Sequence, residues 1–289
     1  MENKNNNIKN FQYFPGHMKK ALNQMENIVK TCQGIIVVLD ARSPESSFPE
    51  GLHSIFQKSN VSRIIYILSK IDLADKNKVN KFIQENTKEN VKFLALDLNK
   101  NNSSQALLDY LETLRFPQDE KYLKHNFPLP PAAFAIVGIP NVGKSTLINN
   151  LFKKKRAQVE NKPGKTRTTT LFKVTKRVEV FDTPGILEPN YKDKKVIMNL
   201  ALLGSVKLDV LPFDELFDYL FEIIKNNHYE ATKSKYNIGD FETTLELLEK
   251  VGTSRNILIK GNIIDYDRVK MMIYKDFQNG LLGPIYLDD

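Results

Sequence analysis

The sequence predicts an α/β protein: a mainly parallel β-sheet with helices on both faces, followed by a small all-helical region. Up to Pro189, short runs rich in Ile and Val alternate with stretches of helical spacing, which is the pattern of a parallel sheet covered on both sides. Beyond Pro189 the strand signal fades, and Leu, Phe and Ile recur at helical spacing instead.

Five apolar runs are predicted to be buried strands, at residues 34–39, 63–68, 91–96, 133–137 and 177–181. A Pro-rich, charged linker at residues 115–131 separates the third run from the fourth. Helices are predicted at residues 210–224, 241–251 and 267–279. Because 289 residues suffice for two ordinary domains, we expect a disordered tail at 1–10, an α/β domain at 11–189 and a helical domain at 190–289.

The formal net charge of +8 is unevenly distributed. Residues 1–187 carry +12, and residues 188–289 carry −4. Within the first part, residues 153–177 hold ten Lys and Arg and one acidic residue, Glu160, which predicts a surface for a polyanion such as RNA. The alternative is that an Asn- and Lys-rich chain is basic throughout, but the acidic second part argues against it.

Membrane and disulfide chemistry are not expected. No apolar run approaches the roughly 20 residues that cross a bilayer, and the N-terminus lacks the apolar core of a signal peptide. We therefore expect a soluble, cytoplasmic protein without a membrane partner. The single cysteine, Cys32, cannot form an internal disulfide and is expected to be a buried apolar side chain.

Gly138-x-x-x-x-Gly143-Lys144-Ser145 lies between a predicted strand and the start of a helix, the setting of a phosphate-binding loop. Its glycines let backbone N–H groups turn towards phosphate oxygens, and the helix N-terminus adds to the attraction. We expect Lys144 to reach the β- and γ-phosphates and Ser145 to hold Mg²⁺. The predicted nucleotide-binding residues of this loop are Asn141, Val142, Gly143, Lys144, Ser145 and Thr146.

Asp182-Thr183-Pro184-Gly185 follows the last predicted strand. At that strand end Asp182 is expected to hold Mg²⁺ through water and Gly185 to offer its N–H to the γ-phosphate. The alternative is an ordinary Pro-Gly turn. Between the two motifs lies a loop at residues 162–170, in which Thr166 is the threonine expected to reach Mg²⁺ and the γ-phosphate, although the loop could also be a plain polar connection.

Ser69-Lys70-Ile71-Asp72 ends the second predicted strand and resembles the Asn-Lys-x-Asp element that recognises guanine. Asp72 would accept both edge N–H groups of guanine while the stem of Lys70 covers the ring. Adenine would leave the buried carboxylate unpaired at a cost of about 1–3 kcal/mol. Ser69 reaches less far than asparagine, and a lone tetrapeptide of this kind is as typical of a helix start. A last base-contacting loop is expected at Ala95, Leu96 and Asp97, without the usual Ser-Ala pair.

The base element precedes the phosphate loop, the reverse of the usual GTPase order, so the chain is predicted to be circularly permuted. Ile186 stands where Ras-type enzymes have a water-positioning Gln, so unaided GTP hydrolysis should be slow. Two residues are candidates to take over the role of this glutamine. Asn141 would ligate a potassium ion beside the phosphates, or be purely structural. His17 would orient water, cap a helix or touch RNA.

The chain resembles the circularly permuted ribosome-assembly GTPases, and among them the ribosome-biogenesis GTPase A family, over nearly its whole length. Besides the nucleotide motifs in this order, the resemblance rests on residues 14–21, on residues 261–287 and on Asp40-Ala41-Arg42-x-Pro44-x-Ser46-Ser47. It implies GTP hydrolysis coupled to late maturation of the large ribosomal subunit, potassium stimulation and an RNA-binding helical tail. Because the tail is net acidic, its RNA contact would need a local face such as Lys260, Arg268, Lys270 and Lys275.

We therefore expect a Mg²⁺-dependent GTPase that converts GTP to GDP slowly by itself and faster on ribosomal particles. Its expected partners are the large ribosomal subunit and its RNA, but no DNA. Two alternatives stay open: a GTPase that acts on another structured RNA, and an RNA-binding scaffold that uses nucleotide only as a structural ligand.

Overall fold

The computed structural model describes residues 16–49, 51–57, 59, 61–89, 91–153, 158–160, 170–187, 191 and 193–289. The tail expected at residues 1–10 and the loop around Thr166 lie outside these residues. Cys32 is buried, as predicted. Within the described residues no helix is long and apolar enough to span a membrane.

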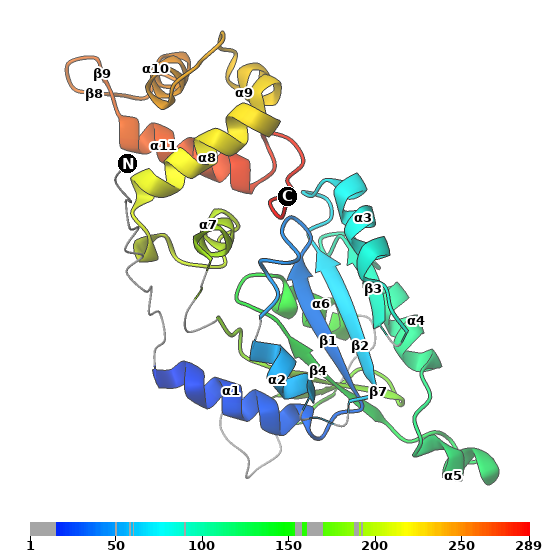
Figure 1. Ribbon diagram of the computed structural model, residues 1–289. Helices are drawn as coiled ribbons and strands as arrows, with labels where there is room; N and C mark the ends of the chain where they lie inside the picture. Colours follow the sequence, from blue (N-terminus) through cyan, green and yellow to red (C-terminus); the bar gives the residue numbers. More distant parts are fainter. Residues whose placement is uncertain are drawn as a thin grey trace, which may run out of the picture.

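A seven-stranded sheet forms the centre of the first part of the chain (Figure 1). Its order is β3-β2-β1-β4-β7-β6-β5, in which the neighbours from β3 to β7 are parallel, while β6 and β5 are antiparallel at one edge. The strands are β1 (Gly34–Asp40), β2 (Arg63–Ser69), β3 (Val91–Leu96), β4 (Ala132–Val137), β5 (Gln158–Glu160), β6 (Leu171–Lys173) and β7 (Val178–Asp182). All five predicted strands are confirmed to within one residue at each end. The pattern does not predict the short strands β5 and β6.

Helices cover both faces of this sheet. The side chains of β1 alternate between the two faces of the sheet. Because helices cover both faces, the strand is buried along its whole length. Ile35 and Val37 share a hydrophobic cluster with α1, α2 and α3, whereas Ile36 and Val38 share one with α4 and α6. These helices are α1 (Gly16–Val29), α2 (Gly51–Gln57), α3 (Lys76–Asn86), α4 (Gln105–Thr113) and α6 (Lys144–Lys153). The α/β fold class is confirmed.

The predicted linker at residues 115–131 contains a short helix, α5 (Asp119–Lys124), which extends away from the sheet in Figure 1. Asp119 is buried and accepts hydrogen bonds from both terminal nitrogens of Arg177, which is buried as well. Arg177 therefore does not contribute to a solvent-facing surface of the basic stretch at 153–177. Lys176 of that stretch is exposed, and most of its other basic residues lie outside the described part of the chain.

The described residues from 193 onwards form a mainly helical region. Its elements are α7 (Lys194–Leu202), the 3-10 helix η1 (Leu208–Val210), α8 (Phe213–Asn227), α9 (Tyr229–Tyr236), α10 (Thr244–Ser254), β8 (Leu258–Ile259), β9 (Ile263–Ile264) and α11 (Tyr266–Gln278). The three predicted helices correspond to α8, α10 and α11. The helical character is confirmed, but the pattern does not predict α7, α9 or the small β8–β9 hairpin.

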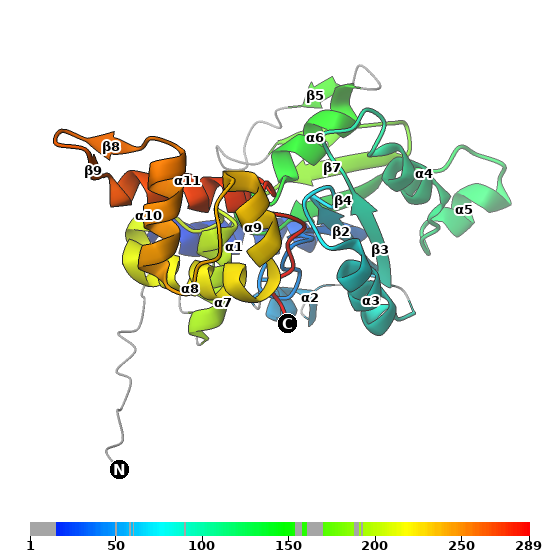
Figure 2. The same cartoon turned by 90° about the horizontal axis from the view of Figure 1, so that it is seen from above.

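This region lies at the carboxyl ends of the parallel strands. The arrowheads of β1 and β2 point towards it in Figure 1, and Figure 2 shows α7 to α11 gathered on one side of the sheet. Ile36 and Ile65 of the sheet belong to the same buried cluster as Leu216 and Phe217 of α8. Ligands of open α/β sheets bind at the carboxyl ends of strands, so a site is expected at this junction.

The last residues of the chain return to the loop after β1. Leu287 donates its N–H to the carbonyl oxygen of Arg42 at 2.8 Å. The carboxylate of Asp288 accepts hydrogen bonds from the hydroxyls of Ser43 at 2.5 Å and Ser46 at 2.6 Å. The loop at residues 40–47, which no nucleotide motif explains, thus receives the end of the chain.

Candidate nucleotide-binding site

The loop between β4 and α6 has a conformation that requires its glycines. Gly143 has a φ of 102°, in the left-handed region. An added Cβ at Gly138 would lie 2.5 Å from the carbonyl oxygen of Val38. Because α6 begins directly after Gly143, the loop presents a helix N-terminus at the carboxyl edge of the sheet, which attracts anions.

Lys144 is buried and folded back over this loop. Its Nζ donates to the carbonyl oxygens of Gly138 at 3.0 Å and Ile139 at 2.7 Å. Burial lowers the pKa of Lys144 to about 8, against the opposing charge of Asp182. A phosphate would supply the counter-charge that two neutral carbonyls do not.

The segment after β7 packs against the phosphate loop. An added Cβ at Gly185 would lie 2.9 Å from Nζ of Lys144 and 2.9 Å from the backbone nitrogen of Pro140, so only glycine fits. The N–H of Ile186 donates to the carbonyl oxygen of Gly138 at 3.4 Å. This close approach favours a nucleotide-sensing segment over an ordinary turn.

Asp182 ends β7 and is half-buried. Burial raises the pKa of its carboxyl, while the charge of Lys144 and the N–H of Thr183 lower it. Ser145 is exposed in the first turn of α6. A carboxylate and a hydroxyl are hard oxygen ligands of the kind that Mg²⁺ takes, so these two side chains fit that ion. The third predicted ligand, Thr166, lies outside the described residues.

Ser69, at the end of β2, is buried between strands and loop. Its Oγ lies 2.6 Å from the carbonyl oxygen of Val142 and 2.9 Å from that of Leu39, so the hydroxyl donates to one of the two. Gly143 approaches Ser69 closely, since its added Cβ would lie 3.7 Å from Ser69 Oγ. A side chain as short as serine therefore suffices to connect the base element to the phosphate loop.

Lys70 follows with a positive φ of 56°. Its Nζ lies 2.9 Å from Oδ2 of Asp40, which is fully buried. The same carboxylate accepts hydrogen bonds from Nε of Arg42 at 2.8 Å and from its Nη2 at 2.7 Å. Burial by itself raises the pKa of Asp40, but the charges and hydrogen bonds of Arg42 and Lys70 outweigh it and lower the pKa to about 2.

Asp72 lies on the turn after β2 and is exposed. Leu73 of the same turn lines the pocket described below, and Asp72 does not. The contact of this carboxylate with the edge of guanine stays a prediction.

The residues predicted for the last base-contacting loop do not line the pocket described below. Ala95 is exposed on β3 and Leu96 is part of the core. The carboxylate of Asp97 accepts a hydrogen bond from the N–H of Asn99 at 3.0 Å. Leu98 and Asn99 line the pocket instead, because β3 runs to Leu96 and the chain turns only after it.

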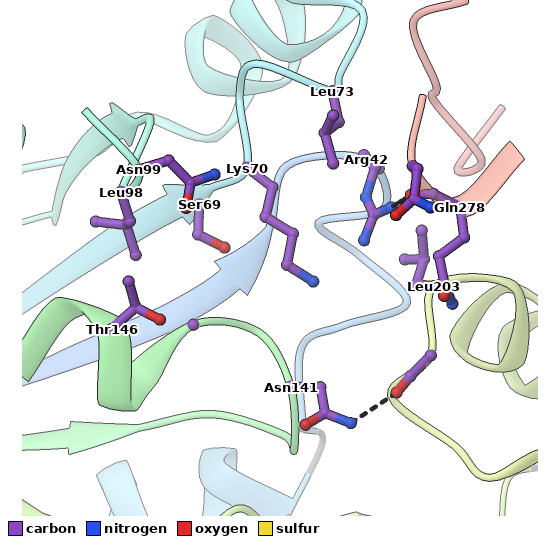
Figure 3. Close-up of a pocket in the computed structure, with 13 residues that line it drawn as sticks. Arg42, Ser69, Lys70, Leu73, Leu98, Asn99, Asn141, Thr146, Leu203 and Gln278 are labelled. Atoms are coloured by element: carbon purple, nitrogen blue, oxygen red, sulfur yellow. Dashed lines mark hydrogen bonds between the residues drawn. The ribbon is translucent and has the colours of Figure 1, made fainter. Parts of the chain in front are cut away.

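A pocket of about 410 Å³ lies at the carboxyl ends of the strands (Figure 3). It is lined by the base element, by the end of the phosphate loop and by the helical region. The lining residues are Arg42, Ser69, Lys70, Leu73, Leu98, Asn99, Asn141, Gly143, Thr146, Leu203, Gly204, Gln278 and Asn279. Sequence reasoning did not predict Arg42, Leu73, Leu98, Asn99 or the four lining residues of the helical region. Arg42, Gln278 and Asn279 entered the sequence analysis only as parts of a predicted helix or of the segments that carry the family resemblance.

Asn141 has a φ of 61°, and its Nδ2 donates to the carbonyl oxygen of Gly204 at 2.8 Å. This contact supports the structural alternative for Asn141, because it joins the phosphate loop to the turn after α7. The donor is the side-chain nitrogen, so Oδ1 keeps its lone pairs for a cation, and the potassium hypothesis stays a prediction.

Ile186 is buried and apolar, so it offers no polar group to an attacking water. It lines a small cavity together with Gly138 and with Leu22 and Met25 of α1. The switch segment and α1 are therefore neighbours. His17 is the second residue of α1, and its side chain lies outside the described part of the structure.

Comparison with protein families gives a match to a model described as "50S ribosome-binding GTPase" over residues 133–249. The match contains the phosphate loop and residues 182–185 but not the base element at 69–72, in keeping with the permuted order.

Similar proteins cover nearly the whole chain. Ribosome biogenesis GTPase A of Bacillus pumilus is 34% identical over 278 residues, which is 95% of this chain and 96% of that protein. Mitochondrial ribosome-associated GTPase 1 of Mus musculus is 30% identical, covering 96% of this chain and 90% of that protein. The crystal structure of GNP-bound YlqF from T. maritima superposes with a TM-score of 0.66 at 24% identity, covering 93% of this chain and 97% of that one.

Proposed function

The chain belongs to the ribosome biogenesis GTPase A family and is a GTPase, and from this premise we propose that it converts GTP to GDP on the large ribosomal subunit during late assembly in the cytoplasm. The observation that carries the proposal is the convergence of Ser69, Lys70, Gly143 and Thr146 on one pocket. We further propose residues 11–189 as the GTPase domain and 190–289 as the ribosome-contacting domain.

In the proposed complex, the base and ribose occupy the pocket and the phosphates lie on the loop from Gly138 to Ser145. Backbone N–H groups at the start of α6 bind the phosphate oxygens. The Nζ of Lys144 exchanges its two carbonyl partners for the β- and γ-phosphates, whose negative charge raises the pKa that burial lowers. Gly185 offers its N–H to the γ-phosphate.

Mg²⁺, when bound, would be held by Ser145, Asp182 and Thr166 and would neutralise charge on the phosphates. Potassium is proposed as a second ion, with Asn141 as its ligand. Because Ile186 is buried, another group has to order the attacking water, and His17 of α1 is the proposed candidate. We accordingly propose slow hydrolysis by the protein alone and stimulation by ribosomal particles.

Support for a ribosomal partner comes from the family description and from the names of the relatives. RNA would contact the basic stretch at 153–177 and a face of the helical region. On that face Lys260, Arg268 and Lys275 are exposed, whereas Lys270 is paired with Asp214 at 2.6 Å. Three cations are thus available there in an otherwise acidic region.

Co-sedimentation with large-subunit particles in GDP and in a non-hydrolysable GTP analogue tests the partner, and single-turnover hydrolysis with and without particles tests the activity. We expect tighter binding with the analogue and faster hydrolysis with particles. Stimulation by another structured RNA but not by ribosomal particles would favour the first alternative. Particle binding without any hydrolysis would favour a scaffold.

A further inference from the structure

Two stretches of the helical region form one wall of the nucleotide pocket. Leu203 and Gly204 follow α7, and Gln278 and Asn279 lie at the end of α11. In Figure 3, Leu203 and Gln278 lie on the opposite side of the pocket from Leu98 and Thr146. A nucleotide that contacts the base loop on one side therefore meets the helical region on the other.

This wall has a fixed internal structure. Nε2 of Gln278 lies 3.1 Å from the carbonyl oxygen of Leu202, to which it donates, and 3.0 Å from the hydroxyl of Tyr274. Gly204 has a φ of 76°, and a Cβ there would lie 2.6 Å from Nε2 of Gln278. The φ of Gly204 favours glycine in the turn after α7, and a larger residue there would also push the amide of Gln278 out of its present position.

The wall is also joined to both halves of the GTPase site. Nη1 of Arg42 donates to the carbonyl oxygen of Gln278 at 2.7 Å, and Arg42 shares the carboxylate of Asp40 with Lys70 of the base element. On the phosphate side, Asn141 donates to Gly204 at 2.8 Å. These contacts surround the pocket. The distance between its two sides therefore depends on the position of the helical region relative to the sheet.

We propose that Gln278 and Asn279 contact the bound nucleotide and that the helical region is thereby part of the guanine-nucleotide site. The inference rests on the proposed function in taking this pocket as the nucleotide site. The volume of about 410 Å³ is typical of ligand pockets. The Nε2 donors of Gln278 are used within the wall, which leaves its Oε1 as an acceptor for a ribose hydroxyl or a base N–H, whereas the amide of Asn279 can supply both donors and an acceptor. By linkage, nucleotide binding and docking of the helical region strengthen each other by the same factor.

The first test measures GDP affinity calorimetrically with unlabelled GDP, since a label on the ribose would lie against the wall. Asn279→Ala is the cleaner variant, because Asn279 is exposed and its truncation leaves the contacts of Gln278 in place. Asn227→Ala is the matched control: it removes an exposed amide at the end of α8, away from the pocket. We expect GDP binding to weaken about tenfold in Asn279→Ala and in Gln278→Ala, and to stay unchanged in the control.

GDP affinity equal to wild type in both Asn279→Ala and Gln278→Ala would overturn the inference. A wild-type protein that binds no GDP would instead contradict the proposed function. Hydrogen exchange of the wild-type protein gives an independent readout that needs no variant. We expect GDP to slow exchange of the amides at residues 278–283, and the absence of any protection there would also overturn the inference.

Discussion

The Oγ atom of Ser69 lies 2.6 Å from the carbonyl oxygen of Val142, so one hydroxyl joins the base-recognition element to the phosphate loop. The two elements are separated by 73 residues in the chain. A contact that fixes them relative to each other prepares the site before nucleotide arrives, which reduces the ordering cost of binding.

Ser69→Ala should weaken GDP binding several-fold and lower the free energy of unfolding by about 1–2 kcal/mol, because the carbonyl oxygen that accepts from this hydroxyl loses its donor in a buried place. Calorimetric binding and urea unfolding measure the two effects. Ser62→Ala is the control, since Ser62 is exposed just before β2 and its hydroxyl bonds only the carbonyl of Gln33. Wild-type binding and stability in Ser69→Ala would show that the contact contributes nothing.

Asp72→Asn should reduce GTP affinity and raise xanthosine triphosphate affinity, because the amide presents a donor where xanthine has an acceptor. Since Asp72 is exposed, we expect a loss near the lower end of about 1–3 kcal/mol. Competition binding with the two nucleotides checks this. Unchanged selectivity would remove Asp72 from the base site.

The sheet could be predicted almost completely from the sequence, because its buried parallel strands, such as Gly34–Asp40, are continuous apolar runs. The phosphate loop and switch segment could also be located, since backbone geometry demands glycine at Gly143 and Gly185. A backbone position that only glycine can occupy is therefore recognisable in the sequence.

The wall formed by Gln278 and Asn279 could not be predicted, because it depends on how α11 docks on a loop that lies 236 residues earlier. The lining of the pocket by Leu98 and Asn99 could not be predicted for a related reason. Leu98 and Asn99 carry no motif, and only the end of β3 decides which residues reach the pocket. Contacts between distant segments have no local pattern to reveal them.

The ion pair of Asp40 predicts a pH-dependent stability. Its pKa is lowered to about 2 in the folded protein, against about 3.9 in an unfolded chain. The pair therefore contributes fully above about pH 4, and the contribution, about 2 kcal/mol, is lost as the pH falls towards about 2.

In Asp40→Asn we expect the free energy of unfolding to fall less steeply over this range, as measured by urea titration at each pH. The variant should also be less stable at neutral pH, because Arg42 is left buried without its carboxylate partner. Glu249→Gln, an exposed change on α10, should keep the wild-type slope; the same slope in Asp40→Asn would contradict the assignment.

Asn141 has two roles that different substitutions separate. Asn141→Asp keeps a side-chain oxygen for potassium but removes the Nδ2 donor to Gly204, whereas Asn141→Ala removes both. At saturating GTP, we expect replacement of sodium by potassium to raise the hydrolysis rate of the wild type and of Asn141→Asp, but not of Asn141→Ala. Equal wild-type rates in the two salts, or full stimulation in Asn141→Ala, would defeat the cation hypothesis.

Nucleotide state should control the helical region by two routes. The covalent route runs from Gly185 through residues 188–190, which lie outside the described structure, and a flexible Gly/Ser insert after Glu188 would loosen it. The second route is non-covalent, through the hydrogen bond from Arg42 to Gln278. Arg42→Lys should weaken this bond while still pairing with Asp40, because lysine keeps the charge but lacks the planar fork.

We expect the wild type to bind large-subunit particles about tenfold tighter with a GTP analogue than with GDP, within the usual range of coupling energies. The insert alone should reduce this preference to about threefold, because it loosens the covalent route and leaves the contact from Arg42 to Gln278 in place. A ligand shifts docking only through contacts that differ between the two states. The insert combined with Arg42→Lys should abolish it. Sedimentation at several particle concentrations measures each ratio. If the insert alone removed the whole preference, the Arg42 contact would transmit nothing, and if the wild type showed no preference, neither route would carry a signal.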